Sequence, residues 1–131
     1  MKAIHILLAV SAAASALMSN IVDAQDMQEI TVQGTRTLNT KEVGQTPTGA
    51  TVVTISLSYG VGIAGLDLAS NAGATEMKRR IHDAAKAACN EITRKYPDAE
   101  PNDADCAKAA AARAMVKARE LESAASKKST K

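Results

Sequence analysis

The sequence predicts a small α+β protein that is mainly α-helical, with an N-terminal strand or short β-hairpin followed by a disulfide-linked hairpin of two helices. Three observations support this prediction. The chain opens with a segment typical of a secretion signal. Residues 50–59 alternate in the manner of a β-strand. Two later segments each carry an apolar stripe at helical spacing, and each stripe contains one cysteine.

The first 24 residues have the pattern of a signal peptide. Lys2 gives a basic start, an apolar stretch runs from residue 4 to 18, and Ala24 is a small residue at a suitable cleavage point. The stretch is shorter than the roughly 20 residues that a membrane-spanning helix needs, so no membrane span is expected. We therefore expect a periplasmic or secreted protein after cleavage near Ala24.

Residues 25–49 are polar and predict a flexible arm, which can contain a short strand at 29–33. From 50 to 59 the residues become β-branched and alternate, which predicts a half-buried strand whose apolar face carries Val53, Ile55, Leu57 and Tyr59. A lone strand leaves its backbone groups unpaired and needs a partner. Either Ile30 to Gln33 or the same strand of a second molecule can supply it, and the second choice gives a homodimer through the edge strand.

The first helix is expected after Ser70 or Asn71, either of which can cap its N-terminus. It ends before Pro97, because a proline pushes the preceding residue out of the helical region. Its apolar positions recur at helical spacing on one face. They are Met77, Ile81, Ala84, Ala85, Ala88, Cys89, Ile92 and Tyr96.

The second helix is expected to begin near Pro101, with Asn102 or Asp103 as its cap. Small side chains dominate its stripe and allow the two helices to approach closely. The stripe consists of Cys106, Ala110, Ala114, Ala118, Leu121 and Ala125. Residues 50–125 then form one domain, and the polar, basic residues 126–131 are expected to be a disordered tail.

Cys89 and Cys106 are the two cysteines of the chain, and an even count in a small exported protein favours a disulfide. The chain has no Phe or Trp and only two Tyr, so its core must be thin. Closing a loop of this size contributes about 3 kcal/mol in the chain-entropy model. A redox pair is the alternative, but such pairs usually form a C-x-x-C motif. A metal site is not expected, because structural zinc needs four Cys or His ligands.

With these features in place, the chain resembles the UrcA family of small exported proteobacterial proteins. The resemblance covers about residues 53–121 and depends on the strand ending in Tyr59, the stretch 66–70, the helical segment 77–81 and the two cysteines. It departs from the family pattern at 60–65, where most members have a shorter polar link. The resemblance implies a periplasmic location and a cysteine-linked hairpin, and it implies no biochemical activity.

Other motifs do not predict an active site. Gly60, Gly62 and Gly65 match the dinucleotide-binding pattern, but that fold needs a helix to open inside the glycine run, whereas the cap here comes at Ser70. His82 is the one histidine left after processing, which gives a catalytic triad little to work with. We therefore expect no catalytic residues, no cofactor and no metal.

The net charge of +2 specifies no partner. The basic run at 78–80 could contact phosphates or lipid head groups, but acids interrupt it and the aromatic residues that stack on bases are missing, so nucleic acid is not expected. The residues that could contact a partner are Tyr59, Asp67, Arg79 and Arg80.

The resulting hypothesis is a non-enzymatic periplasmic accessory or interaction protein whose partner is another envelope protein. The helical hairpin would present a face to this partner, and the strand edge could pair with it. The alternative hypothesis is a thiol-dependent envelope stress or redox sensor that uses Cys89 and Cys106.

Overall fold

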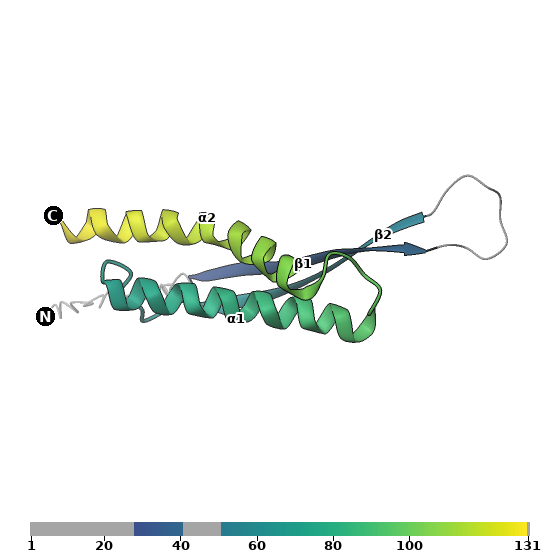
Figure 1. Ribbon diagram of the computed structural model, residues 1–131. Helices are drawn as coiled ribbons and strands as arrows, with labels where there is room; N and C mark the ends of the chain where they lie inside the picture. The colour runs from purple at the N-terminus through teal and green to yellow at the C-terminus, as the bar shows by residue number, and fades with distance from the viewer. Residues whose placement is uncertain (1–27, 41–50, 131) are drawn as a thin grey trace, which may run out of the picture.

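A computed structural model describes residues 28–40 and 51–130, so the predicted signal peptide at 1–24 lies outside the described residues. A β-hairpin comes first and two helices follow. The elements are β1 (Glu29–Thr40), β2 (Thr51–Gly62), α1 (Asn71–Lys95) and α2 (Asp103–Ser129). The helices run alongside the hairpin, and the strand ends next to 41–50 extend past the turn between the helices (Figure 1). The predicted fold class is confirmed. No helix in the described part of the chain is long and apolar enough to cross a membrane.

The two strands pair antiparallel over their whole length, from Glu29 opposite Gly62 to Thr40 opposite Thr51. The first strand therefore lies within the molecule as the partner of the second, which was one of the two predicted arrangements. It also extends to Thr40, beyond the predicted 29–33 and into the segment predicted to be a flexible arm. The threonines explain the difference, because they are polar in composition but β-branched and favourable in strands.

Helix α1 begins and ends as its capping residues predict. The Ser70 side chain accepts a hydrogen bond from the Gly73 backbone N–H at 3.1 Å, and Tyr96 ends the helix just before Pro97. The buried residues of α1 are Gly73, Met77, Ile81, Ala85, Ala88, Cys89 and Ile92. Tyr96, predicted at the end of this stripe, is instead 41% exposed.

Helix α2 is capped by Asn102, whose side chain accepts a hydrogen bond from the Asp105 backbone N–H at 3.0 Å. Its buried residues are Cys106, Ala110, Ala111, Ala114 and Ala118. The helix continues to Ser129, past the predicted end at residue 125. Lys127 and Lys128 in its last turn favour this extension, since they complement the negative end of the helix dipole.

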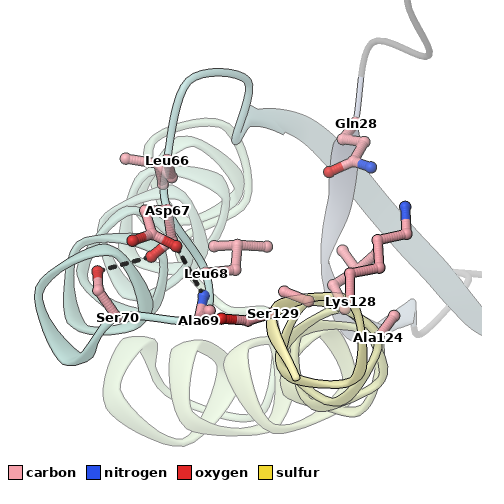
Figure 2. A pocket seen from close by; sticks show the side chains of 11 residues that line it. Gln28, Leu66, Asp67, Leu68, Ala69, Ser70, Ala124, Lys128 and Ser129 are labelled. Atoms are coloured by element: carbon pink, nitrogen blue, oxygen red, sulfur yellow. Dashed lines mark hydrogen bonds between the residues drawn. The ribbon is translucent and has the colours of Figure 1, made fainter. Parts of the chain in front are cut away.

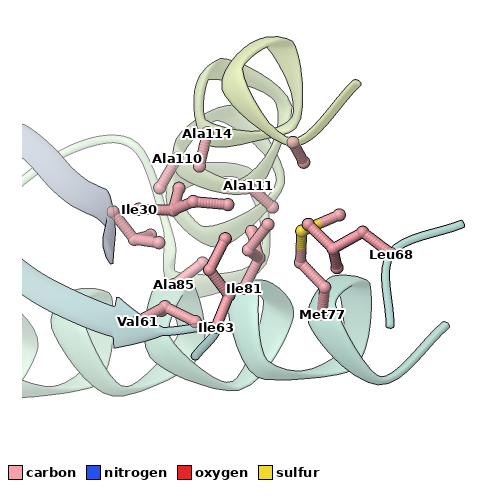
Figure 3. Packing of buried hydrophobic residues seen from close by; sticks show 12 residues of the cluster. Ile30, Val61, Ile63, Leu68, Met77, Ile81, Ala85, Ala110, Ala111 and Ala114 are labelled. Atoms are coloured by element: carbon pink, nitrogen blue, oxygen red, sulfur yellow. The ribbon is translucent and has the colours of Figure 1, made fainter. Parts of the chain in front are cut away.

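The core lies between the hairpin and the two helices, and Figure 3 shows its packing. Ile30 and Val61 come from the strands, and Met77 and Ile81 come from α1. The buried residues that α2 adds to this core are all alanines. This confirms the prediction of a thin core, because small side chains remove little area from water.

Candidate functional site

The two predicted cysteines form a disulfide that joins α1 to α2. The Cα atoms of Cys89 and Cys106 lie 6.0 Å apart, and both residues are buried. Strand β1 crosses directly over this bridge at Gly34, where an added Cβ would lie 3.2 Å from the Cys89 sulfur. The disulfide is therefore covered by the sheet.

A buried arginine, which the sequence did not predict, lies beside the disulfide. Arg36 projects from β1 toward the helices, is 2% exposed and forms an ion pair with Asp103 at the start of α2. Its Nη1 also donates a hydrogen bond to the Ala99 carbonyl at 3.1 Å. Thr93 of α1 donates to the same Asp103 carboxylate. A single carboxylate thus connects β1, α1 and α2.

The outer edge of β1 is closed. Thr37 donates its backbone N–H to the Glu100 carbonyl at 2.7 Å, and the Glu100 N–H donates to the Thr37 carbonyl at 2.8 Å. Further along the edge, Arg113 of α2 donates to the Gln33 carbonyl at 2.9 Å. The turn between the helices and α2 therefore cover this side of the sheet.

Within residues 28–40 and 51–130, the outer edge of β2 is open along Thr54, Ser56 and Ser58. The backbone N–H and C=O groups of Thr37 point to Glu100 and therefore away from β2. In an antiparallel pair, the residue directly opposite, Thr54, then points its own N–H and C=O groups away from β1. The alternation along an antiparallel strand turns the groups of Ser56 and Ser58 outward as well. Among the described residues, no hydrogen bond reaches these outward groups.

Beside this edge lies an apolar surface on the helix-facing side of β2. Its residues are not fully covered by α1: Tyr59 is 39% exposed, and Ile55 and Leu57 are half-buried. A shallow groove of about 200 Å³ runs between this part of β2 and the end of α1. Its lining is Ile55, Ser56, Leu57, Glu91, Ile92, Lys95 and Tyr96. We call the outward backbone of β2 and this groove the β2 edge site.

Asp67, predicted as a possible contact residue, has a structural position at the start of α1. Its side chain accepts a hydrogen bond from the Ala69 backbone N–H at 3.1 Å, and its carbonyl accepts one from the Ser70 hydroxyl at 2.7 Å (Figure 2). Helix α1 lies so close to this turn that a Cβ on Gly73 would be 2.0 Å from the Asp67 carbonyl oxygen. A cavity of about 560 Å³ separates the turn from the end of α2, with Lys128 on its far side.

Arg79 and Arg80 are engaged within the molecule. Both donate to Glu76, and Arg80 also donates to the Gly62 carbonyl at 2.8 Å, which links α1 to the end of β2. Hydrogen bonds from Arg79 and then from Arg80 lower the pKa of Glu76 to about 2. The hydrogen bond to Glu76 in turn raises the pKa of Arg79.

Tyr59 is the one predicted contact residue on the apolar surface of β2 next to the β2 edge site. In the described part of the chain, no hydrogen bond or shared cavity joins it to Asp67, Arg79 or Arg80. His82 lines a separate groove of about 480 Å³ between the two helices, with Lys86 and Lys108 among its neighbours. Residues 28–40 and 51–130 contain no cluster of three metal-ligating side chains.

The glycine motif adopts the local structure that argued against a dinucleotide site. Gly60 and Gly62 belong to β2, and Gly65 has a φ of 78°, a left-handed conformation that favours glycine. Helix α1 begins at Asn71, after the motif has ended. No helix N-terminus therefore lies at the glycines to receive a phosphate.

The chain was compared with models of protein families, with curated proteins and with solved structures, and none of them matches. The resemblance to the UrcA family stays a prediction. Among the described residues, the β2 edge site combines unpaired backbone groups with exposed apolar side chains.

Proposed function

We propose that this protein is a non-enzymatic periplasmic accessory protein that binds a strand of another envelope protein chain at the β2 edge site. The observation that carries the proposal is the open edge of β2. This strand has 12 residues, none charged and none proline, and it pairs with β1 without a bulge. Proteins usually protect an exposed edge strand with a charged residue, a proline or a bulge, because such an edge pairs readily with another chain.

The groove beside the edge suits the same mode of binding. A strand added to a sheet edge gains affinity from backbone hydrogen bonds and specificity from pockets that receive alternate side chains. Here the outward backbone groups of Thr54, Ser56 and Ser58 supply the first element. Ile55, Leu57 and Tyr96 line a groove that supplies the second. The partner segment is therefore expected to be extended and apolar on one face.

The periplasmic location is part of the proposal. A buried disulfide suits an oxidising compartment, and the start of the chain has the pattern of a signal peptide. The disulfide-linked hairpin is also what the UrcA resemblance implies, and we propose membership of that family on the same grounds. The partner strand can come from a different envelope protein or from a second copy of this chain.

The burial of the disulfide favours this proposal over a thiol-dependent stress or redox sensor. Cys89 and Cys106 are 0% and 1% exposed, and Gly34 of β1 lies over the Cys89 sulfur. Reactive cysteines are at least partly exposed and have a stabilised thiolate. A reductant would reach this bridge only after the hairpin had opened from the helices.

Site-specific photocrosslinking in intact cells tests the proposed function. A photoreactive amino acid replaces Ser58, which is exposed on the open edge, and in a control replaces Ala112, which is exposed on α2. We expect a reproducible adduct with a protein chain from Ser58 and none from Ala112. Absence of any Ser58 adduct, or the same adducts from both positions, would contradict binding at the β2 edge site.

A further inference from the structure

We propose that the partner strand at the β2 edge site is the β2 strand of a second copy, so that two hairpins form one four-stranded antiparallel sheet. This inference rests on the proposed function and specifies its partner. A two-stranded hairpin is marginal by itself, and sheets of three or more strands are more stable. Pairing two copies would remove both open edges in one step.

The sequence of β2 is self-complementary in one antiparallel register. If Ser56 lies opposite Ser56 of the second copy, Ile55 lies opposite Leu57 and Val53 lies opposite Tyr59. Directly opposed residues share a face of the sheet, so these four apolar positions all remain on the helix-facing side. The polar residues Thr54 and Ser58 then meet each other on the solvent face.

The backbone alternation fits the same register. Thr54, Ser56 and Ser58 direct their N–H and C=O groups outward, as the pairing of Thr37 with Glu100 requires. In the two-fold arrangement Ser56 exchanges hydrogen bonds with its own copy, and Thr54 exchanges them with Ser58. Each of the outward groups in this central stretch therefore finds a partner.

The charges at the rim of the groove also suit a two-fold axis at Ser56. Glu91 and Lys95 of α1 both line the groove next to Ile55, Ser56 and Leu57, and they form an ion pair at 3.3 Å. Because the second copy runs in the opposite direction, its Lys95 lies nearest to Glu91 and its Glu91 nearest to Lys95. Opposite charges thus meet across the axis, as expected of a surface that fits its own copy.

Three of the five exposed large apolar side chains in the described part of the chain lie where the second copy would cover them, and the other two, Val52 and Val116, lie on the solvent face of β2 and on α2. Tyr59, Val53 and Tyr96 are each about two-fifths exposed, at 39%, 42% and 41%. Tyr59 and Val53 are opposed across the axis in the proposed register, and Tyr96 lines the groove beside it. Aromatic residues are enriched at such interfaces.

Replacement of Ser56 by lysine tests the proposal, with Thr35→Lys as a matched control. Thr35 lies opposite Ser56 on β1, and their hydroxyls are hydrogen-bonded at 3.2 Å, so both variants lose this contact and add one positive charge. In the dimer, however, two Ser56→Lys charges face each other at the axis. We expect sedimentation to give a dimer for the wild-type chain and for Thr35→Lys, and a monomer for Ser56→Lys. A monomeric wild type or a dimeric Ser56→Lys would overturn the inference.

Cysteine crosslinking tests the register independently of any loss of folding. In the proposed dimer, the two Ser56 side chains lie about 5 Å apart. The two Ser58 side chains lie four residues apart along the strands, about 14 Å. A short bifunctional thiol reagent should therefore link Ser56→Cys efficiently and Ser58→Cys poorly, and the opposite order would overturn the register.

The photocrosslinking at Ser58 separates the two proposals. An adduct between two copies of this chain supports both. An adduct with a different protein alone leaves the proposed function standing and refutes the second copy as partner. Absence of any adduct refutes both.

Discussion

The two edges of the small sheet are treated in opposite ways. The edge of β1 is closed by backbone hydrogen bonds to Glu100 and by Arg113, and buried Arg36 anchors the same strand to the helices. Among the described residues, the edge of β2 has one such contact, from Arg80 to the Gly62 carbonyl at its end, and none along Thr54, Ser56 and Ser58; the strand carries no charge. Contacts that hold the fold together are concentrated on the β1 side, which leaves the β2 side available for binding.

One cross-strand pair, Val32 and Tyr59, shows the difference between the two sides of the sheet. The two residues lie opposite each other and share the helix-facing side, yet Val32 is 0% exposed and Tyr59 is 39% exposed. The helices therefore cover β1 from Ile30 to Arg36 and cover β2 only in part. Changes on the β1 side should affect stability, and changes at the β2 edge should affect association.

Loss of the disulfide should cause the largest loss of stability. The bridge closes a loop with a sequence separation of 17 residues, and the double variant Cys89→Ala, Cys106→Ala is expected to lower the free energy of unfolding by about 3 kcal/mol. Urea denaturation measures this difference. A loss below about 1 kcal/mol would show that the bridge constrains the unfolded chain far less than that entropy model assumes.

Reduction of the wild-type protein provides the control for this prediction. Because both sulfurs are buried, a mild reductant should leave the bridge intact in the folded protein and break it once urea has unfolded the chain. The free energy of unfolding of the wild-type protein, measured in urea under reducing conditions, should then match that of the double variant. Rapid reduction of the folded protein would instead favour the thiol-sensor hypothesis.

Arg36→Met should have the second-largest effect. Methionine keeps an unbranched apolar side chain but removes the ion pair with Asp103 and the hydrogen bond to Ala99. Breaking a fully buried pair costs about 3 to 5 kcal/mol, but Asp103 is 45% exposed and can be rehydrated. We therefore expect the free energy of unfolding to fall by about 2 kcal/mol, a value within the range found for hydrogen bonds to charged groups.

Arg113→Met is the matched control for Arg36. Both arginines connect β1 to another element, but Arg113 is exposed, and its hydrogen bond to Gln33 lies at the surface. Surface substitutions usually change stability by about 0.5 kcal/mol or less. If both variants lost the same free energy of unfolding, the burial of Arg36 would add nothing to its contribution to stability.

Much of the fold follows from local patterns in the sequence. The caps Ser70 and Asn102 and the stop before Pro97 depend on neighbouring residues, and the two stripes place Cys89 and Cys106 in contact. These features can be predicted from the sequence because the caps and the helix end depend on neighbouring residues, and the disulfide depends on the pairing of two cysteines.

The candidate site is harder to predict because its features depend on distant segments. Arg36 and Asp103 are 67 residues apart, and nothing local identifies them as partners. The period-two pattern of Ile30 and Val32 would have placed Gly34 and Arg36 on the inner face, had the strand been extended past Gln33. The sequence could not predict which edge of the sheet is open, because this depends on Glu100, which pairs with the edge of β1.

Two glycines in the sheet allow the finest comparison between its sides. An added Cβ at Gly34 of β1 would lie 3.1 Å from the Ala88 Cβ and 3.2 Å from the Cys89 sulfur, while at Gly62 of β2 it would meet nothing within 4 Å. Alanine gains stability over glycine where its backbone conformation is allowed, by about 0.4 to 1 kcal/mol. At Gly34 this gain is outweighed by crowding in a well-packed region, which costs about 1 to 3 kcal/mol.

We therefore expect Gly34→Ala to be destabilised by about 1 kcal/mol and Gly62→Ala to be slightly stabilised, by about 0.5 kcal/mol. Thermal and urea denaturation of the two variants, with the disulfide intact, give both values. The opposite signs are the informative result, because both substitutions add the same methyl group to the same sheet. If Gly34→Ala were stabilised as well, β1 would not be in tight contact with α1 over the disulfide, and the contrast between the two sides would be lost.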